Sequence, residues 1–141
     1  MKKLYLCLFL TACVSRFNPS TLPIKVGEAT ALINEVFGYN IIDDSGKTIE
    51  VEIERLESPI RGLTRNRVLV ILASDLENYE VMTVLLHELG HAMGLNHVDE
   101  TDDIMYIEEV TYKPLKELAG DLVRDCELQD KCKEILKVVI K

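Results

Sequence analysis

Residues 87–97 read HELGHAMGLNH, and this stretch contains all 3 histidines of the chain. His87 and His91 are four positions apart, so on a helix they lie on the same face, one turn apart. At that spacing two imidazoles can bind one tetrahedral metal ion at about 2.0–2.1 Å each. Glu88 is displaced from His87 by about 100° around the helix axis, which places its carboxylate beside the ion rather than on it. The stretch therefore predicts a helix that carries two metal ligands and a proton acceptor.

Gly94 and His97 supply the rest of the pattern. A helix continued beyond His91 would carry later residues away from the ion, whereas glycine can adopt the positive φ that ends a helix. Gly94 is therefore expected to turn the chain so that His97 becomes the third ligand. Three neutral imidazoles leave one coordination position open, which is typical of a catalytic zinc. HExxH alone also occurs by chance in unrelated proteins, but the glycine and the third histidine at these offsets favour the zinc site.

Helical and strand periodicities flank this stretch on both sides. Apolar residues recur every three or four positions in the predicted helices, and they alternate with glutamate in TIEVEIERL at residues 48–56. RVLVILA at residues 67–73 is continuously apolar, as in a strand covered on both faces or packed at an edge. The expected helices are residues 28–37, about 80–93 and 114–128, and the expected strands are residues 22–26, 48–56 and 67–73. Elements of both kinds in no regular βαβ order predict a mixed α/β fold.

Turn and cap residues set the expected ends of these elements. Gly27 is expected to end the first strand, Gly38 to cap the helix at 28–37, and residues 43–46 (DDSG) to form a turn. Pro114 opens the last helix. For the helix that carries the histidines, the candidate N-caps are Ser74, Asp75 and Asn78. The tail at 132–141 is left open as either a helix or a strand.

Composition indicates one globular domain. At 141 residues the chain is within the usual size of a single domain and can bury a core. Hydrophobic residues make up 48% and charged residues 28%, which is the balance of a folded rather than a disordered chain. The formal net charge of -8 gives an acidic surface that repels phosphate backbones. A nucleic acid is therefore not expected as a partner, and the oligomeric state is not predicted.

The first residues have the layout of a secretory signal. Lys2 and Lys3 precede the apolar run LYLCLFL at residues 4–10, which is too short to span a bilayer. The next residues, Leu10-Thr11-Ala12-Cys13, resemble the lipobox of bacterial lipoproteins, in which cleavage precedes the cysteine and a diacylglyceryl group is attached to its sulfur. This resemblance implies a signal peptide at 1–12, a lipidated tether at 13–21 and a domain at 22–141. The alternative, a buried first strand at 4–10, fits the two lysines and the lack of polar alternation less well.

A lipid on Cys13 would anchor the domain to a membrane face without spanning the membrane. The expected location is then extracytoplasmic, on the periplasmic or cell-surface side. Disulfides form in such compartments, and Cys126 and Cys132 remain as a pair once Cys7 leaves with the signal. A bridge needs a turn between them, because positions i and i+6 of one continuous helix have poor disulfide geometry. The sequence leaves a disulfide and two free thiols equally open.

HExxHxxGxxH is the signature of the metzincin clan of zinc peptidases, and residues 87–97 match it at every specified position. The clan also has a methionine turn, in which a methionine side chain lies beneath the zinc ligands. Met105 in the sequence Asp-Ile-Met-Tyr looks like that residue. Its spacing from His97, and Tyr106 directly after it, are similar to those of matrixins, the matrix metalloproteinase family. The chain is thus identified as a matrixin-like metzincin, with the detailed resemblance covering residues 79–106.

The resemblance implies a zincin-type twisted mixed sheet packed on helices. It places the active-site helix at about 80–93 and a small C-terminal subdomain, with the methionine turn and a helix, after it. Residues 67–73, the strand before the active-site helix, would be the edge that pairs with an extended substrate. No histidine remains for a second, structural zinc, and a structural Ca2+ has no support in the sequence. The implied site residues are His87, His91 and His97 as ligands of one Zn2+, Glu88 as the catalytic base, and Gly94, Met105 and Tyr106 as shaping residues.

These features predict a zinc-dependent endopeptidase that acts on extracytoplasmic proteins or peptides, with a zinc-activated water and Glu88 as general base. The alternative is a catalytically silent zinc-binding lipoprotein that acts as a binding module. The presence of Glu88 favours the enzyme, because zinc binding alone does not need that carboxylate. For Tyr106, ordinary packing in the methionine turn is nearly as well supported as a place in the pocket wall. An acidic loop could favour basic peptides, but a solvated charge run is the preferred interpretation; its members are Asp99, Glu100, Asp102 and Asp103.

Overall fold

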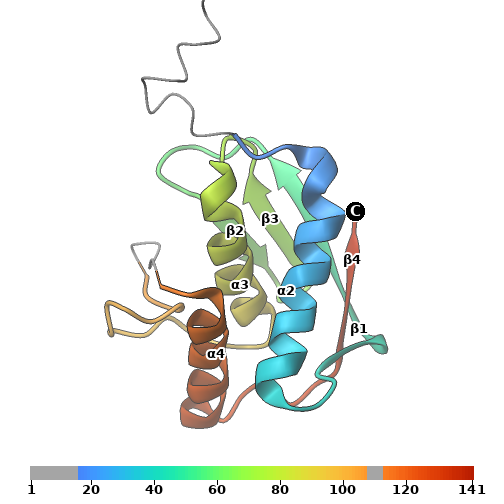
Figure 1. Cartoon of the computed structure of the whole chain (residues 1–141), viewed down its shortest axis with the longest axis vertical. Coiled ribbons are helices and arrows are strands. Elements are labelled where there is room, and N and C mark those ends of the chain that lie inside the picture. Colours follow the sequence, from blue (N-terminus) through green and yellow to red (C-terminus); the bar gives the residue numbers. More distant parts are fainter. Residues whose placement is uncertain (1–15, 108–112) are drawn as a thin grey trace, which may run out of the picture.

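The computed structural model describes residues 16–107 and 113–141, which form a sheet with helices on one of its faces (Figure 1). Helices α2 (Leu22–Phe37) and α3 (Val81–Ala92) lie against the sheet, and α4 (Leu115–Gln129) packs against both of them. This arrangement confirms the predicted fold class. The predicted signal peptide, the lipidation cysteine Cys13 and the first residues of the tether lie outside the described residues.

The sheet has four strands in the order β2-β3-β1-β4. β1 (Ile42–Glu54) pairs in parallel with β3 (Leu69–Ala73) and with β4 (Leu136–Ile140), and β2 (Gly62–Arg65) pairs antiparallel with β3. β4 answers the question that the sequence left open, because the apolar tail forms a strand rather than a helix. The chain therefore leaves the sheet for α3 and α4 and returns to it with its last strand (Figure 1).

α2 begins earlier than the sequence indicated, and the strand expected at 22–26 is wrong. The buried residues of α2 follow one helical stripe, with spacings of four, three and four: Leu22, Val26, Ala29 and Ile33. Gly27 lies inside this helix, where a Cβ would meet no atom within 4 Å, so the glycine faces open space and ends no element. Gly38 does end the helix as predicted, with a φ of 75° and its N–H donating to the Asn34 carbonyl.

β1 begins earlier than the predicted strand at 48–56 and ends at Glu54, and the expected turn at 43–46 lies within its bounds as an irregularity. Ile42 and Lys47 both register with Leu136, so the residues between them form a bulge. Gly46 allows the close approach, since a Cβ there would be 2.4 Å from the Ile135 carbonyl oxygen. These turn-forming residues therefore bend the strand rather than end it.

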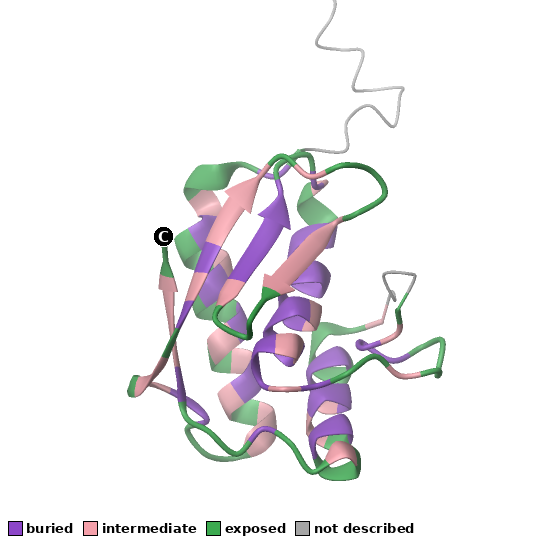
Figure 2. Ribbon diagram, turned by 180° about the vertical axis from the view of Figure 1, so that it is seen from behind, coloured by how far each residue is buried: buried purple, intermediate pink, exposed green. Residues whose placement is uncertain are grey.

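β2 was not indicated by the sequence, and it takes the edge position expected for residues 67–73. β3 lies between β2 and β1, and its last four residues are fully buried (Figure 2). Asn66 and Arg67, with φ of 51° and 61°, make the turn between β2 and β3. β2 is only four residues long, GLTR, and carries no apolar alternation that could reveal it. The expectation that residues 67–73 form the edge is therefore wrong, and β2 is the edge strand beside α3.

α3 is buried along nearly its whole length (Figure 2). Its N-cap position is Glu80, and none of the three residues that the sequence suggested caps it. The Glu77 and Glu80 side chains form a reciprocal capping box around the 3-10 turn η3 (Asn78–Glu80), which leads directly into α3. Glu80 also accepts a hydrogen bond from Arg61 at 2.8 Å. A glutamate in the capping position is not a usual N-cap, which is why the sequence pattern pointed elsewhere.

Candidate metal centre

The three histidines come together at the end of α3. His87 and His91 project from successive turns of the helix, and His97 returns to them from the segment that follows it. One ring nitrogen from each lies within 4.8 Å of the other two, and the His91 and His97 Nε2 atoms are 3.1 Å apart. Two nitrogens at about 2.0–2.1 Å from one tetrahedral ion would be about 3.3–3.4 Å apart. The donor set and its spacing therefore fit a single zinc ion.

Two of the three imidazoles are oriented by backbone carbonyls. His87 Nδ1 lies 2.6 Å from the Ile104 oxygen, and His91 Nδ1 lies 2.8 Å from the Leu95 oxygen. An Nδ1–H donated to a carbonyl leaves the Nε2 lone pair free for a metal. Burial lowers the pKa of all three histidines, because it disfavours the charged imidazolium. The site thus holds its imidazoles in the neutral form that binds a metal.

Gly94 makes the turn that the sequence predicted. Its φ is 105°, and the following N–H, that of Leu95, donates to the Gly90 carbonyl at 2.9 Å. A Cβ on Gly94 would be 3.1 Å from Arg67 Nη2, so the turn is also closely packed from the side of β2 and β3. Any other residue would have to adopt a backbone conformation that L side chains rarely take.

Met105 packs against α3 at Gly90, which lies between the two helical ligands in the sequence. The Met105 side chain is fully buried, and a Cβ at Gly90 would be 2.5 Å from its sulfur. Val98 N–H donates to the Met105 carbonyl at 3.0 Å, which ties the methionine turn to the chain just after His97. Met105 was predicted from the sequence, but the role of Gly90 was not. The glycine within HELGH was the available signal, because a glycine inside a buried helix suggests close packing.

Glu88 is held by the edge strand. Its side chain is buried, and the Thr64 hydroxyl donates to Glu88 Oε1 at 2.7 Å. Gly62 lets the strand approach, since a Cβ there would be 2.9 Å from Glu88 Cγ. Burial raises the pKa of Glu88, and the Thr64 hydrogen bond and nearby His91 oppose that rise. A carboxylate whose pKa is raised is a better proton acceptor. Neither Thr64 nor Gly62 was predicted, because the four-residue strand that carries them was not recognised.

A cavity of about 810 Å3 opens over this centre. Its walls come from β2, α3, the turn at Gly94 and the segment that follows Met105. Tyr106 is half-buried and lines this cavity, as one of the two interpretations of the sequence proposed. Apart from the three histidines, the charged side chains in the lining are Arg61, Arg67 and Glu88.

The acidic loop divides into two parts, and the solvated interpretation is wrong for Asp103. Asp103 is fully buried, accepts a hydrogen bond from the Met105 N–H at 2.7 Å, and pairs with the Arg124 guanidinium. It therefore ties the methionine turn to Arg124 on α4, which the sequence did not reveal. The other three acidic residues are exposed, as expected: Asp99, Glu100 and Asp102.

A second buried carboxyl, that of Asp125, faces Asp103 from α4. Asp125 is fully buried, and within the described residues no donor reaches either of its oxygens. The nearest guanidinium nitrogen, Arg124 Nε, is 3.9 Å away. Burial, followed by the hydrogen bond with Asp103, raises the pKa of Asp125 to about 8. Asp125 therefore carries a proton at neutral pH and donates it to Asp103.

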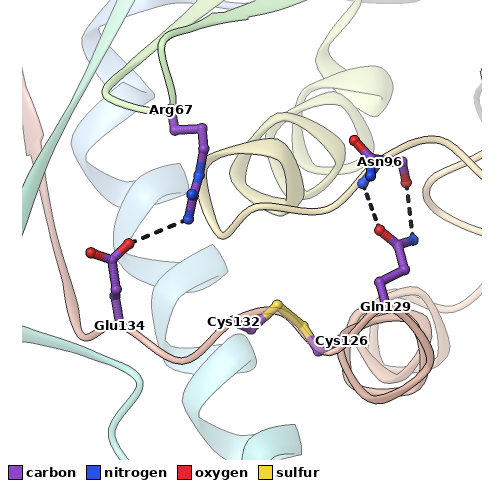
Figure 3. Close-up of a disulfide and its surroundings, with 6 residues drawn as sticks. All are labelled: Arg67, Asn96, Cys126, Gln129, Cys132 and Glu134. Carbon is purple, nitrogen blue, oxygen red and sulfur yellow. Dashed lines mark hydrogen bonds and ion pairs between the residues drawn. A yellow bond between two sulfur atoms is a disulfide. The ribbon is translucent and has the colours of Figure 1, made fainter.

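Cys126 and Cys132 form a disulfide, with their Cα atoms 5.6 Å apart (Figure 3). The turn that such a bridge needs is present, because α4 ends at Gln129 and Asp130 adopts a left-handed conformation with a φ of 56°. The alternative of two free thiols is not what the structure shows. The bridge closes the short loop beside the end of α3.

A family model described as Matrixin matches residues 34–125, which is well over half of the 141-residue chain. The matched range contains the histidines, Glu88, Gly94 and Met105. No curated protein and no solved structure matches the chain.

Proposed function

Since the chain belongs to the matrixin family of metallopeptidases, we propose that it is a zinc-dependent endopeptidase with Glu88 as its general base. One observation carries this proposal. Three neutral imidazoles converge within 4.8 Å, and a buried carboxylate stands beside them at the floor of an open cavity. Three protein ligands with room for a water are the arrangement of a hydrolytic zinc rather than of a structural one.

Each residue of the site has a separate role in the proposed hydrolysis. A zinc ion held by the three histidines would lower the pKa of a bound water toward about 7 and polarise the scissile carbonyl. Glu88 takes the water's proton and passes it to the leaving amine. Thr64 occupies Glu88 Oε1, which leaves Oε2 as the oxygen that carries the proton. The Ile104 and Leu95 carbonyls keep two imidazoles in place while the charge on the reacting atoms changes.

β2 is the proposed platform for an extended peptide. Its backbone groups on the side away from β3 have no strand partner within the described residues, so a substrate can add there as an antiparallel strand. β2 runs in the same direction as α3: Gly62 lies against Val84 and Glu88, and Arg67, in the turn after β2, lies against Gly94. An antiparallel substrate would therefore place its N-terminal half toward Gly94 and its C-terminal half toward Val84.

Much of the cavity's surface is apolar. Its lining includes Ile60, Val84, Ile104 and Ile107, together with Tyr106. A medium or large apolar side chain just after the scissile bond would remove this surface from water, which favours binding by roughly 25 cal/mol per Å2 buried. We therefore propose peptides with an apolar residue at that position as the preferred substrate class.

The proposed location is extracytoplasmic, with a lipid at Cys13 as the membrane anchor. The short basic start, the apolar run and the lipobox-like end of residues 1–13 support it. No helix in the described part of the chain is long and apolar enough to cross a membrane. The anchor is tested by labelling cells with a fatty-acid analogue. The label should be incorporated by the natural chain and lost in Cys13→Ser, and equal labelling of both would contradict the assignment.

Hydrolysis of a mixed peptide library tests the function itself. The protein lacking residues 1–13 is stripped with a chelator and then given one equivalent of zinc. We expect cleavage with zinc and none after stripping, and the sequences around the cut bonds should show the apolar preference. Zinc bound at one equivalent without cleavage of any peptide would favour the alternative, a zinc-binding module.

A further inference from the structure

The third metal ligand is held differently from the other two. His87 and His91 each have a backbone carbonyl at Nδ1, but no hydrogen bond to Nδ1 of His97 is found within residues 16–107 and 113–141. His97 is also an exposed residue and lies outside any helix or strand. Its position must therefore come from the backbone that carries it, the short segment between Gly94 and the bridge that Val98 forms with Tyr106.

Gln129 fixes that backbone at the residue before the ligand. The Asn96 N–H donates to Gln129 Oε1 at 2.8 Å, and Gln129 Nε2 donates to the Asn96 carbonyl at 3.2 Å (Figure 3). One side-chain amide thus satisfies both backbone groups of one residue, as a neighbouring strand would. Asn96 lies between Leu95, whose carbonyl orients His91, and His97 itself. The pair of hydrogen bonds at Asn96, which we call the clamp, therefore restrains the positions of both His91 and His97.

The disulfide holds the end of α4 from which Gln129 acts. It joins Cys126, one turn before Gln129, to Cys132, in the segment after the helix. The Cys132 N–H donates to the Met93 carbonyl at 3.2 Å, and Met93 is the residue that ends α3. In Figure 3 the disulfide lies between two pairs of side chains, Gln129 with Asn96 on one side and Arg67 with Glu134 on the other. Arg67 Nη2 donates to Glu134 Oε1 at 3.3 Å. The loop closed by the disulfide is thus tied both to the end of α3, at Met93, and to Asn96, the residue before the third ligand.

We propose that Gln129 is a positioning residue for the third zinc ligand, and that the Cys126–Cys132 disulfide fixes the helix end from which it acts. The proposal rests on the zinc site of the proposed function but not on peptide hydrolysis. Groups that orient metal ligands without touching the metal typically change metal affinity by 10- to 100-fold when they are removed.

Zinc affinity measured by competition with a chromophoric chelator tests the proposal. Gln129→Ala should weaken zinc binding by roughly tenfold. Gln129→Glu keeps an acceptor for the Asn96 N–H but has no donor for the Asn96 carbonyl. Its zinc affinity should therefore lie between those of the natural protein and Gln129→Ala. Glu127→Ala, a truncation of an exposed side chain on the same turn of α4, is the matched control and should bind zinc as the natural protein does.

A double Cys126→Ser, Cys132→Ser variant tests the part played by the disulfide. It should also weaken zinc binding. Adding Gln129→Ala to it should reduce the zinc affinity by less than the same substitution does in the natural protein, because both changes release the same clamp. The visible spectrum of the Co2+-substituted protein gives a second readout, since loss of His97 from the metal changes the coordination and therefore the absorption intensity. The natural chain and Glu127→Ala should give the same spectrum, and Gln129→Ala a different one.

The results separate this proposal from the proposed function. A zinc affinity of Gln129→Ala within about twofold of the natural protein would overturn the positioning role. An equal loss in Gln129→Ala and Glu127→Ala would also overturn it, because the cause would then be a general weakening of α4. Zinc affinity that responds as expected in a protein without peptidase activity would uphold the clamp and reject the peptidase. No zinc binding by the natural chain would reject both.

Discussion

Thr64 controls how Glu88 is presented, because its hydroxyl donates to Glu88 Oε1 at 2.7 Å from the edge strand. Thr64→Val keeps the branched shape and removes the donor. This hydrogen bond, worth about 1.5 kcal/mol or more, fixes the position of the carboxylate. Without it Glu88 can leave the position from which it accepts the proton, so kcat should fall by roughly tenfold even though the pKa of Glu88 rises. Zinc affinity should not change, since Thr64 contacts no ligand in the hydrogen bonds described. Thr64→Ser should restore the rate, and a kcat of Thr64→Val equal to that of the natural protein would exclude this role.

Gly90 is needed because Met105 occupies the space where a side chain would be. Alanine normally stabilises a helix over glycine by about 0.5–1 kcal/mol. At Gly90, however, a Cβ would be 2.5 Å from the buried Met105 sulfur, and overpacking of this kind costs about 1–3 kcal/mol. The clash should therefore outweigh the helix preference, and Gly90→Ala should lower the free energy of unfolding in urea.

Gly27→Ala is the matched control for that variant. Gly27 also lies within a helix, but a Cβ there meets nothing within 4 Å. The same substitution should therefore raise the stability by about 0.5–1 kcal/mol. Stabilisation by both substitutions would show that the space at Gly90 is not filled by Met105 as described.

At the scale of the helices and strands, the sequence predicted an element well where its pattern was long and its boundary residue unambiguous. α3 carries a full amphipathic repeat, and Gly94 and Gly38 end their helices with positive φ. Gly27 was misread, because a glycine on an open helix face and a glycine that ends a strand look the same in the sequence. β2 could not be found, since four residues with one aliphatic side chain carry no period.

The residues of the candidate site were likewise predictable only where they are close together in the sequence. The histidines, Glu88, Gly94 and Met105 lie within a spacing fixed by one helix and one turn, so local geometry was enough to identify them. Thr64 and Gln129 reach the site from β2 and from α4, and Asp125 reaches the methionine turn from α4. Contacts between distant parts of the chain leave no periodic signal. Residues that support the centre through such contacts therefore required the structure.

The packing of α4 against the methionine turn predicts a dependence of stability on pH. Asp125 faces Asp103, Asp121 and Arg124, and its pKa is raised to about 8 by burial and then by Asp103. An unfolded aspartate has a pKa of about 3.9. Between these two values the folded state holds a proton that the unfolded state has lost. Asp125 therefore makes the free energy of unfolding fall as pH rises from about 4 to 8, with no further effect above that.

Asp125→Asn tests this sign. The asparagine amide donates to Asp103 as the protonated acid does, but it does not titrate. The stability of the variant relative to the natural protein should therefore increase with pH between 5 and 8, by up to about 1.4 kcal/mol per pH unit. Urea unfolding of both metal-free proteins measures it, and the histidines, being common to both, cancel in the difference. Parallel curves over this range would mean that Asp125 is ionised in the folded protein.

At the scale of the whole molecule, the last strand connects the metal centre to the sheet. After the methionine turn and α4, the disulfide-closed loop leads into β4, which pairs with β1. The residues that carry the metal centre therefore lie in a chain segment anchored to the sheet at both ends, by β3 before α3 and by β4 after α4. The sequence predicted the mixed fold but left this return open, because an apolar run of this length fits either a helix or a strand.

Glu88→Gln shows whether Glu88 is the proton acceptor at the three-histidine zinc site. Glutamine has nearly the same shape and can still accept the Thr64 hydrogen bond, but it cannot take a proton from water. kcat/KM is measured on one peptide cleaved by the natural protein, with one equivalent of zinc confirmed in both proteins. We expect kcat/KM of the variant to be about 10^2- to 10^4-fold lower, with unchanged zinc content. Equal kcat/KM values in the two zinc-loaded proteins would show that Glu88 is not the base.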